Sequence, residues 1–69
     1  MICLKNRLLA LRKENHLPQT EVAKELNLSI SAYCRYEYGQ REPTLSVLIR
    51  MADYYGVTLD YLAGRSDDR

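Results

Sequence analysis

Residues 19–39 read QTEVAKELNLSISAYCRYEYG. The first part of this stretch predicts a helix over residues 19–26, because apolar side chains recur there at helical spacing. A tight turn of three residues follows, and Ser29 at its end can cap the next helix. That helix is predicted over residues 30–38, and Gly39 ends it. The stretch therefore predicts two short helices joined by a three-residue turn.

A further helix is predicted ahead of this pair, over residues 3–15. Leu4, Leu8 and Leu11 fall at the spacing i, i+4, i+7, so they lie on one face of that helix. Pro18 ends the pattern, because proline disfavours a helical backbone at the residue before it. One face of this first helix is therefore apolar.

Two more helices are predicted after the pair. Thr44 is placed to cap a helix over residues 45–55, where apolar side chains repeat at helical spacing, and Gly56 ends it. Thr58 is placed to cap a last short helix that runs to about Ala63. The expected fold class is therefore all-α, with five short helices.

The length of 69 residues allows one domain, which we assign to residues 1–64, with residues 65–69 as a flexible tail. A core of this size is marginal unless a partner covers part of its surface. We therefore expect a homodimer. Tyr54, Tyr55 and Tyr61 crowd the last third of the chain, where they could finish the core or form a subunit interface.

Cys3 and Cys34 are too few and too far apart for a disulfide framework, and no Cys/His cluster has metal-ligand spacing. We expect reduced thiols and a cytoplasmic location. The apolar run at residues 8–11 is too short to span a membrane, and the chain lacks a signal-peptide cleavage pattern. No cofactor or small-molecule ligand is indicated. An enzyme is the weakest interpretation, because the sequence has neither a Gly-rich phosphate loop nor a nucleophile with a base.

The formal net charge is +1, which by itself does not indicate a nucleic-acid partner. Residues 1–42 contain seven Lys/Arg and five Asp/Glu, and residues 43–69 contain three Lys/Arg and four Asp, so the balance is +2 against −1. This difference is small beside the basic arms of many nucleic-acid binders. A prediction of DNA binding must therefore depend on geometry.

The predicted pair of helices and their turn have the dimensions of a helix-turn-helix, whose second helix enters the major groove of DNA. Ser31, Cys34, Arg35 and Tyr38 form one stripe along that second helix. In a major groove Arg35 can offer a bidentate fork to guanine, and Ser31 can exchange a hydrogen bond with a base edge. Ile30, at the tip of the helix, could contact a thymine methyl group.

Each of these residues also has a structural interpretation. The stripe could be an ordinary solvated helix face, and Ile30 could cap the hydrophobic core instead of reading a base. For Cys34 we favour the interpretation of a small side chain that fills space over that of a redox switch. Oxidation of a thiol beside the stripe could nevertheless interfere with binding.

Spaced features extend along nearly the whole chain: Leu11-Arg12, Leu17-Pro18-Gln19, Val22-Ala23, Leu26-Asn27-Leu28-Ser29, Tyr36-Glu37-Tyr38-Gly39, Pro43, Leu48, Ala52 and Gly56-Val57-Thr58. In this series the chain closely resembles the Cro/C1-type helix-turn-helix family of phage repressors and bacterial transcriptional regulators. The resemblance implies a lambda-repressor-like fold. Ala23 stands at the family's small residue where the two helices cross, and Asn27 takes the place usually held by glycine in the turn. Two residues depart from the family pattern: Pro18 replaces a capping residue, and aromatic Tyr33 replaces a branched aliphatic one.

The resemblance also implies residue roles. It places the base-reading positions at Ile30, Ser31 and Arg35. It further implies an ion pair between Arg12, late in the first helix, and Glu37, late in the third helix, which would lock the recognition helix in orientation. The alternative is that these are two unrelated surface charges, which would contribute little to stability.

Contacts with DNA phosphates would position the domain without specifying sequence. Gln19 begins the second helix, where its amide and the free backbone N–H groups can grip a phosphate, and the resemblance places a backbone-contacting glutamine there. Ser29, Tyr38, Gln40 and Arg41 flank the two ends of the third helix and complete the predicted phosphate contacts. For Arg41, a free surface arginine is the alternative.

These observations predict a sequence-specific, double-stranded-DNA-binding transcriptional regulator, specifically a homodimeric repressor that binds a two-fold operator. The alternative is a helix-turn-helix module for protein interaction, or an antitoxin whose main partner is another protein. The near-neutral charge leaves this alternative open. The dependence of DNA affinity on salt would separate the two functions.

Overall fold

The computed structural model describes residues 4–69, so the predicted helix start at Cys3 and the Cys3 thiol lie outside the described residues. Over this range the chain forms five α-helices and no strand. The all-α fold class is therefore confirmed, and the C-terminal end of each helix lies within one residue of its predicted position. The helices are α1 (Leu4–Glu14), α2 (Gln19–Glu25), α3 (Ile30–Glu37), α4 (Leu45–Tyr55) and α5 (Leu59–Leu62).

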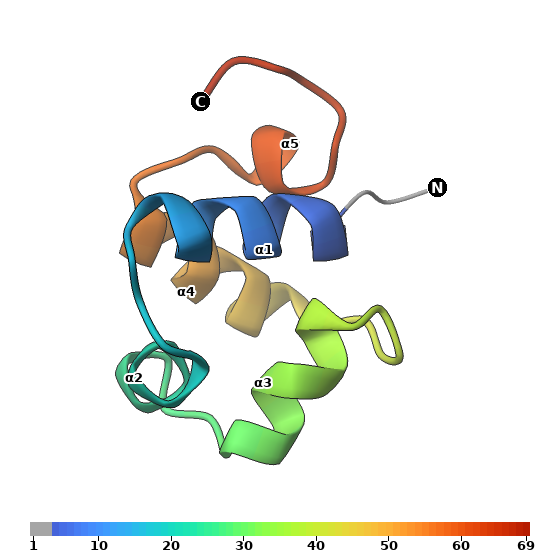
Figure 1. Ribbon diagram of the computed structural model, residues 1–69. Helices are drawn as coiled ribbons and strands as arrows, with labels where there is room; N and C mark the ends of the chain where they lie inside the picture. The colour runs from blue at the N-terminus through green and yellow to red at the C-terminus, as the bar shows by residue number, and fades with distance from the viewer. Residues whose placement is uncertain (1–3) are drawn as a thin grey trace.

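The α1 helix crosses the molecule between two groups of elements (Figure 1). In this view α5 and the C-terminal segment lie above α1, and α2 and α3 lie below it, with α4 in between. The packing contacts agree, since α1 touches both α3 and α5, and α3 also touches α2. The pair of helices that carries the helix-turn-helix pattern thus occupies one end of the molecule.

The helices begin where short hydroxyl side chains cap them. Ser29 Oγ accepts a hydrogen bond from the backbone N–H of Ala32 at 3.1 Å, at the start of α3. Thr44 and Thr58 cap α4 and α5 in the same way. These three predicted caps are confirmed, and each supplies an acceptor for a backbone N–H group that the helix itself leaves unpaired. Pro18 precedes α2 without a side-chain cap bond.

The core is built by apolar faces from all five helices. Tyr33 on α3 is fully buried, which shows that this departure from the family pattern fills the centre of the domain with an aromatic ring. Tyr61 on α5 is also buried, whereas Tyr54 and Tyr55 pack against the core only partly buried. In the monomer, then, the C-terminal aromatic residues mainly complete the core. The buried hydrophobic residues are Leu4, Leu8, Leu11, Val22, Ala23, Leu26, Tyr33, Tyr36, Val47, Met51, Ala52, Tyr61 and Leu62.

The turn between α2 and α3 depends on Asn27, whose φ is +59°. This is the left-handed conformation that asparagine adopts more readily than most residues other than glycine. The predicted role of Asn27 in the turn is therefore confirmed. Gly56, with φ of +67°, uses the same conformation to end α4.

Residues 65–69 lie against α1 and α5. The Arg7 guanidinium donates to Asp67 at 2.9 Å and stacks over the Tyr61 ring at 4.1 Å from its centroid. Arg69 reaches the carboxylate of Glu14, with one hydrogen bond of 2.6 Å, and its guanidinium lies 5.3 Å from the same Tyr61 ring. The C-terminal segment lies on the opposite side of α1 from α2 and α3 (Figure 1).

Candidate nucleic-acid interface

The outer face of α3 presents the three residues predicted to read bases. Ile30 is 43% exposed, and Ser31 and Arg35 are also exposed. The Arg35 guanidinium forms no hydrogen bond or salt bridge with any other described side chain or backbone group. Because Ser31 and Arg35 are four residues apart on a helix, they lie on the same side of α3, free to meet a ligand.

The other two residues of the predicted stripe are less free. Cys34 is half-buried, and its Sγ donates a hydrogen bond of 3.4 Å to Oε1 of Gln19 on α2. The hydroxyl oxygen of Tyr38 accepts a hydrogen bond of 3.4 Å from Nε2 of the same Gln19, although the Tyr38 side chain is 57% exposed. Among the described residues, Ser31 and Arg35 are thus left unpaired, whereas Cys34 and Tyr38 are hydrogen-bonded to α2.

A buried carboxylate joins α3 to α1. Glu37 is only 4% exposed, and it forms a bidentate pair with Arg12 on α1. Nε and Nη2 of Arg12 donate to the two carboxylate oxygens, both at 2.8 Å. Nη1 of Arg12 donates to the backbone oxygen of Leu17 at 3.0 Å, so the guanidinium also holds the segment that leads into α2.

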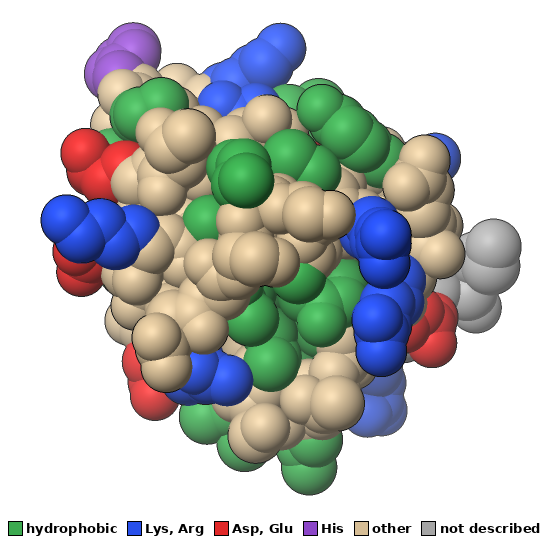
Figure 2. Space-filling view, turned by 90° about the horizontal axis from the view of Figure 1, so that it is seen from below, with side chains coloured by type: hydrophobic (Ala, Val, Ile, Leu, Met, Phe, Trp, Pro, Cys, Tyr) green, Lys and Arg blue, Asp and Glu red, His purple; other side chains and the backbone are tan. Residues whose placement is uncertain are grey.

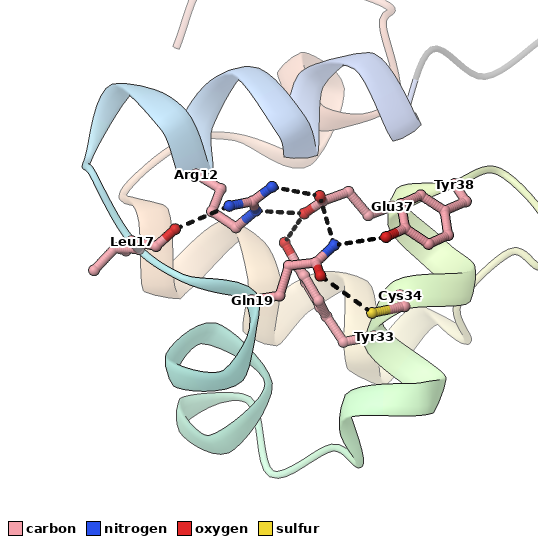
Figure 3. A network of polar contacts seen from close by, with 7 residues as sticks. All are labelled: Arg12, Leu17, Gln19, Tyr33, Cys34, Glu37 and Tyr38. Atoms are coloured by element: carbon pink, nitrogen blue, oxygen red, sulfur yellow. Dashed lines mark hydrogen bonds and ion pairs between the residues drawn. The ribbon is translucent and has the colours of Figure 1, made fainter.

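Two further side chains complete the hydrogen bonding of Glu37 (Figure 3). The Tyr33 hydroxyl donates to Oε2 at 2.7 Å from within α3, and Gln19 Nε2 donates to Oε1 at 3.1 Å from the start of α2. We call Arg12, Gln19, Tyr33 and Glu37 the polar hub. The hub connects α1, α2 and α3, and so it fixes the orientation of α3 relative to the other two helices.

Hydrogen bonding keeps the buried carboxylate ionised. Burial is the largest single influence on Glu37 and acts to raise its pKa, but the hydrogen bonds from Arg12, Tyr33 and Gln19 together outweigh it and leave the pKa lowered. The hydrogen bond to Glu37 raises the pKa of Arg12. Burial raises the pKa of Tyr33, and its hydrogen bond to Glu37 acts in the same direction. The hub is thus a charged pair surrounded by neutral donors.

The remaining predicted phosphate contacts lie at the two ends of α3. Ser29 is exposed at its start, where its oxygen serves as the helix cap and its own hydroxyl hydrogen stays available. Gln40 and Arg41 are exposed in the loop that follows α3. Seen from the end where α2 and α3 lie, hydrophobic side chains gather in the middle of the surface, and a column of Lys and Arg side chains lies to their right (Figure 2). Acidic side chains appear mainly near the edges of this view.

Besides the hydrogen bonds between Gln19 and residues 34–38, sequence reasoning missed other anchoring contacts. The Tyr33 hydroxyl bond to Glu37 was not predicted, because the departure at Tyr33 indicated only an unusual aromatic residue. Arg50 Nη1 on α4 donates to the backbone oxygen of Leu26 at 2.9 Å, at the C-terminal end of α2. The unpaired carbonyl groups at the end of every helix are a general signal for such a donor, but they do not say which residue supplies it.

Two kinds of feature are absent from the part of the chain that the structure describes. No group of three or more His, Cys, Asp or Glu side chains among residues 4–69 is placed to hold a metal ion. Over the same residues, no helix combines the length and the apolar character needed to cross a membrane.

Comparison with curated proteins finds relatives that match most of this chain. A family model described as helix-turn-helix matches residues 8–62. The cryptic phage CTXphi transcriptional repressor RstR of Vibrio cholerae is 36% identical over 62 residues, which cover 90% of this chain and 55% of that protein. The HTH-type transcriptional regulator AnsR of Bacillus subtilis is 36% identical over 64 residues, covering 93% of this chain and 55% of that protein. The chain thus spans about half the length of these relatives.

Solved structures show the same architecture. A transcriptional regulator from Listeria innocua superposes with a TM-score of 0.89 and 28% identity, over 100% of this chain and 64% of that chain. The P22 c2 repressor, solved in complex with a synthetic operator, superposes with a TM-score of 0.85 and 24% identity, over 91% of this chain and 96% of that chain. The lambda-repressor-like fold predicted from the sequence is therefore confirmed. With the match of the family model, these findings show that the chain belongs to the Cro/C1-type helix-turn-helix family.

Proposed function

We propose that this chain is a sequence-specific DNA-binding domain of a transcriptional regulator, and that it acts as a repressor on a two-fold operator. The observation that carries the proposal is the Arg35 guanidinium, which pairs with nothing among residues 4–69 and lies beside Ser31 on a helix that the polar hub holds in place. A preorganised helix with free donors on its outer face is suited to read base edges in a major groove.

In this proposal α3 lies in the major groove. Arg35 forms a bidentate contact with guanine, Ser31 bonds to a base edge, and Ile30 contacts a thymine methyl group. A rim around them positions the domain on the sugar-phosphate backbone. The residues of this rim are Gln19, Ser29, Tyr38, Gln40 and Arg41.

We propose further that two copies bind the operator together. Leu45 and Ile49 on α4 are 66% and 41% exposed and lie one helical turn apart, and Leu59 on α5 is 37% exposed. A second copy would remove part of this apolar surface from water. The relatives named as transcriptional repressor and regulator support the function, which we place in the cytoplasm and regard as binding without catalysis.

The test is selection of bound duplexes from a random DNA pool, followed by measurement of affinity against salt concentration. We expect a palindromic consensus, and an affinity that falls steeply as salt rises because bound cations are released from the DNA. Weak binding without a consensus would contradict the proposal. Tight, salt-insensitive binding to another protein instead would favour the alternative function, a protein-interaction module or an antitoxin.

A further inference from the structure

We infer that the Tyr55 hydroxyl donates a hydrogen bond to the Tyr33 hydroxyl, and that Tyr55 is thereby a positioning residue for α3, the helix proposed to read DNA. Tyr55 is the last residue of α4, a helix that contributes none of the four members of the polar hub. The hydrogen bond joins α4 to the hub. The part of the inference that concerns DNA depends on the proposed function, whereas the hydrogen bond itself does not.

The Tyr55 hydroxyl is buried without a partner. Although the side chain as a whole is only partly buried, its hydroxyl oxygen is shielded from water and forms no hydrogen bond with any other group among residues 4–69. It is the only side-chain nitrogen or oxygen of this kind in the part of the chain that the structure describes. A hydroxyl that leaves water without finding a partner destabilises a fold. A partner is therefore expected among the groups that lie next to it.

The neighbours of this hydroxyl belong to the polar hub. Burial raises the pKa of Tyr55, its contact with the Tyr33 hydroxyl acts to lower it, and the charges of Glu37 and Arg12 act on it as well. Burial likewise raises the pKa of Tyr33, and the nearby Tyr55 hydroxyl adds to this effect. Groups influence each other in this way only at short range. The Tyr55 hydroxyl therefore lies beside the Tyr33 hydroxyl, close to the charged pair of the hub.

Hydrogen-bonding capacity decides which hydroxyl donates. Each tyrosine hydroxyl has one hydrogen to donate and an oxygen that can accept. The hydrogen of Tyr33 is taken by the ionised carboxylate of Glu37, at 2.7 Å, whereas the oxygen of Tyr33 remains able to accept. Tyr55 must therefore be the donor, and a small movement of its partly buried ring completes the bond. The result is a chain of hydrogen bonds from Tyr55 through Tyr33 to Glu37, in which each bond polarises the next.

With this bond, α4 holds both helices of the helix-turn-helix pair. Arg50, also on α4, donates to the backbone oxygen of Leu26 at the end of α2, at 2.9 Å. Tyr55 holds α3 through Tyr33, whose side chain is fully buried. The proposed base-reading residues project from the exposed side of the same helix, so a change in how Tyr33 is held moves them together relative to a bound duplex. Tyr55 thus influences DNA recognition without touching DNA.

A double-mutant cycle tests the hydrogen bond. The variants are Tyr55→Phe, Tyr33→Phe and the two combined, and circular dichroism measures their melting temperatures. Tyr55→Phe is expected to lower the melting temperature by about 4 to 8 °C, the shift for the loss of one hydrogen bond in a domain of this size. In the Tyr33→Phe background it should cause no loss, because the Tyr55 hydroxyl has no partner there. Tyr54→Phe is the matched control, since it removes a hydroxyl from the preceding residue of α4 and should leave the melting temperature nearly unchanged.

DNA binding tests the positioning role. Fluorescence anisotropy, at a temperature where every variant is folded, measures affinity for a duplex selected from the random pool and for a duplex of arbitrary sequence. Tyr55→Phe is expected to reduce the ratio of these two affinities by roughly fivefold, the smallest discrimination that one good bidentate contact supplies. A residue that only stabilises the fold would leave this ratio unchanged, and so should Tyr54→Phe.

The possible failures are distinguishable. If Tyr55→Phe leaves the melting temperature unchanged or raises it, the hydroxyl is unpaired and the inference is wrong. An equal loss with and without the Tyr33 hydroxyl means that the partner is not Tyr33, which also overturns the inference. If the hydrogen bond is found but the affinity ratio stays the same, Tyr55 is not a positioning residue. If the unaltered domain does not prefer the selected duplex, the proposed function fails, and the melting cycle still decides whether the hydrogen bond exists.

Discussion

The Arg12 guanidinium and the Glu37 carboxylate form a bidentate pair with two hydrogen bonds of 2.8 Å, although they are 25 residues apart in the sequence. The Glu37 side chain is 1% exposed and that of Arg12 is 16% exposed, so water screens this pair far less than a pair on the surface. Removing one partner leaves the other charge unpaired away from water, which destabilises the fold more than the loss of a surface ion pair does.

The first prediction is that Glu37→Gln destabilises the domain by about 3 kcal/mol, the scale expected when one partner of a buried pair is removed. Urea denaturation followed by circular dichroism measures this loss. Glu42→Gln is the matched control, because Glu42 is an exposed carboxylate in the loop after α3 and should change stability by less than about 0.5 kcal/mol. Equal losses of stability in the two variants would show that the Arg12–Glu37 pair stabilises the domain no more than an exposed carboxylate does.

The second prediction concerns acid. The pKa of Glu37 in the folded protein lies below its ordinary value of 4.5, so the folded state releases this proton more readily than the unfolded state does. The resulting stability is fully present above about pH 4.5 and is lost as the pH falls from there through the folded pKa. Urea midpoints between pH 7 and pH 3 should therefore fall more steeply for the unaltered domain than for Glu37→Gln. The lowered pKa of Glu14 affects both proteins, so their difference isolates Glu37. Parallel curves would contradict the assignment.

The third prediction is that Arg35→Ala weakens binding to the selected operator by about 1 to 3 kcal/mol and relaxes the preference for guanine at one position. Arg35→Lys is the control, since it keeps the positive charge but loses the planar fork. Lysine should therefore retain affinity for arbitrary DNA while losing much of the discrimination. Anisotropy titrations with the selected duplex and with single-base variants measure both effects. Unchanged operator affinity in Arg35→Ala would remove Arg35 from the base-reading residues.

The fourth prediction concerns the turn between α2 and α3. Asn27→Ala should destabilise the domain by about 1 kcal/mol, because φ of +59° strains an alanine backbone, whereas Asn27→Gly should stay within a few tenths of a kcal/mol of the unaltered protein. Thermal melting of both variants distinguishes them. A similar loss in both would mean that the asparagine side chain, and not its backbone conformation, is what the turn requires.

Local chemistry made much of the fold predictable from the sequence. Ser29, Thr44 and Thr58 each cap the helix that was predicted to follow, because capping involves atoms only three residues apart. Asn27 was predictable for the same reason, since the conformation it must adopt limits which residues fit.

The candidate site was less predictable, because its contacts join distant parts of the chain. Helical spacing placed Cys34 and Tyr38 on the outer stripe with Arg35, but it could not show that Gln19, from another helix, ties both of them to α2. The hydrogen bond from Arg50 to the end of α2 could not be predicted for the same reason. Spacing predicts which face a side chain occupies, whereas pairing depends on how the helices cross.

The α3 helix is divided into two sides, with Tyr33 and Glu37 buried on one and Ser31 and Arg35 exposed on the other. Substitutions on the exposed side leave the contacts of the hub and the core in place, so under the proposed function the DNA preference would change without refolding of the scaffold. If Ile30, Ser31 and Arg35 read bases as proposed, a library that randomises these three positions would yield regulators with new targets on one unchanged architecture.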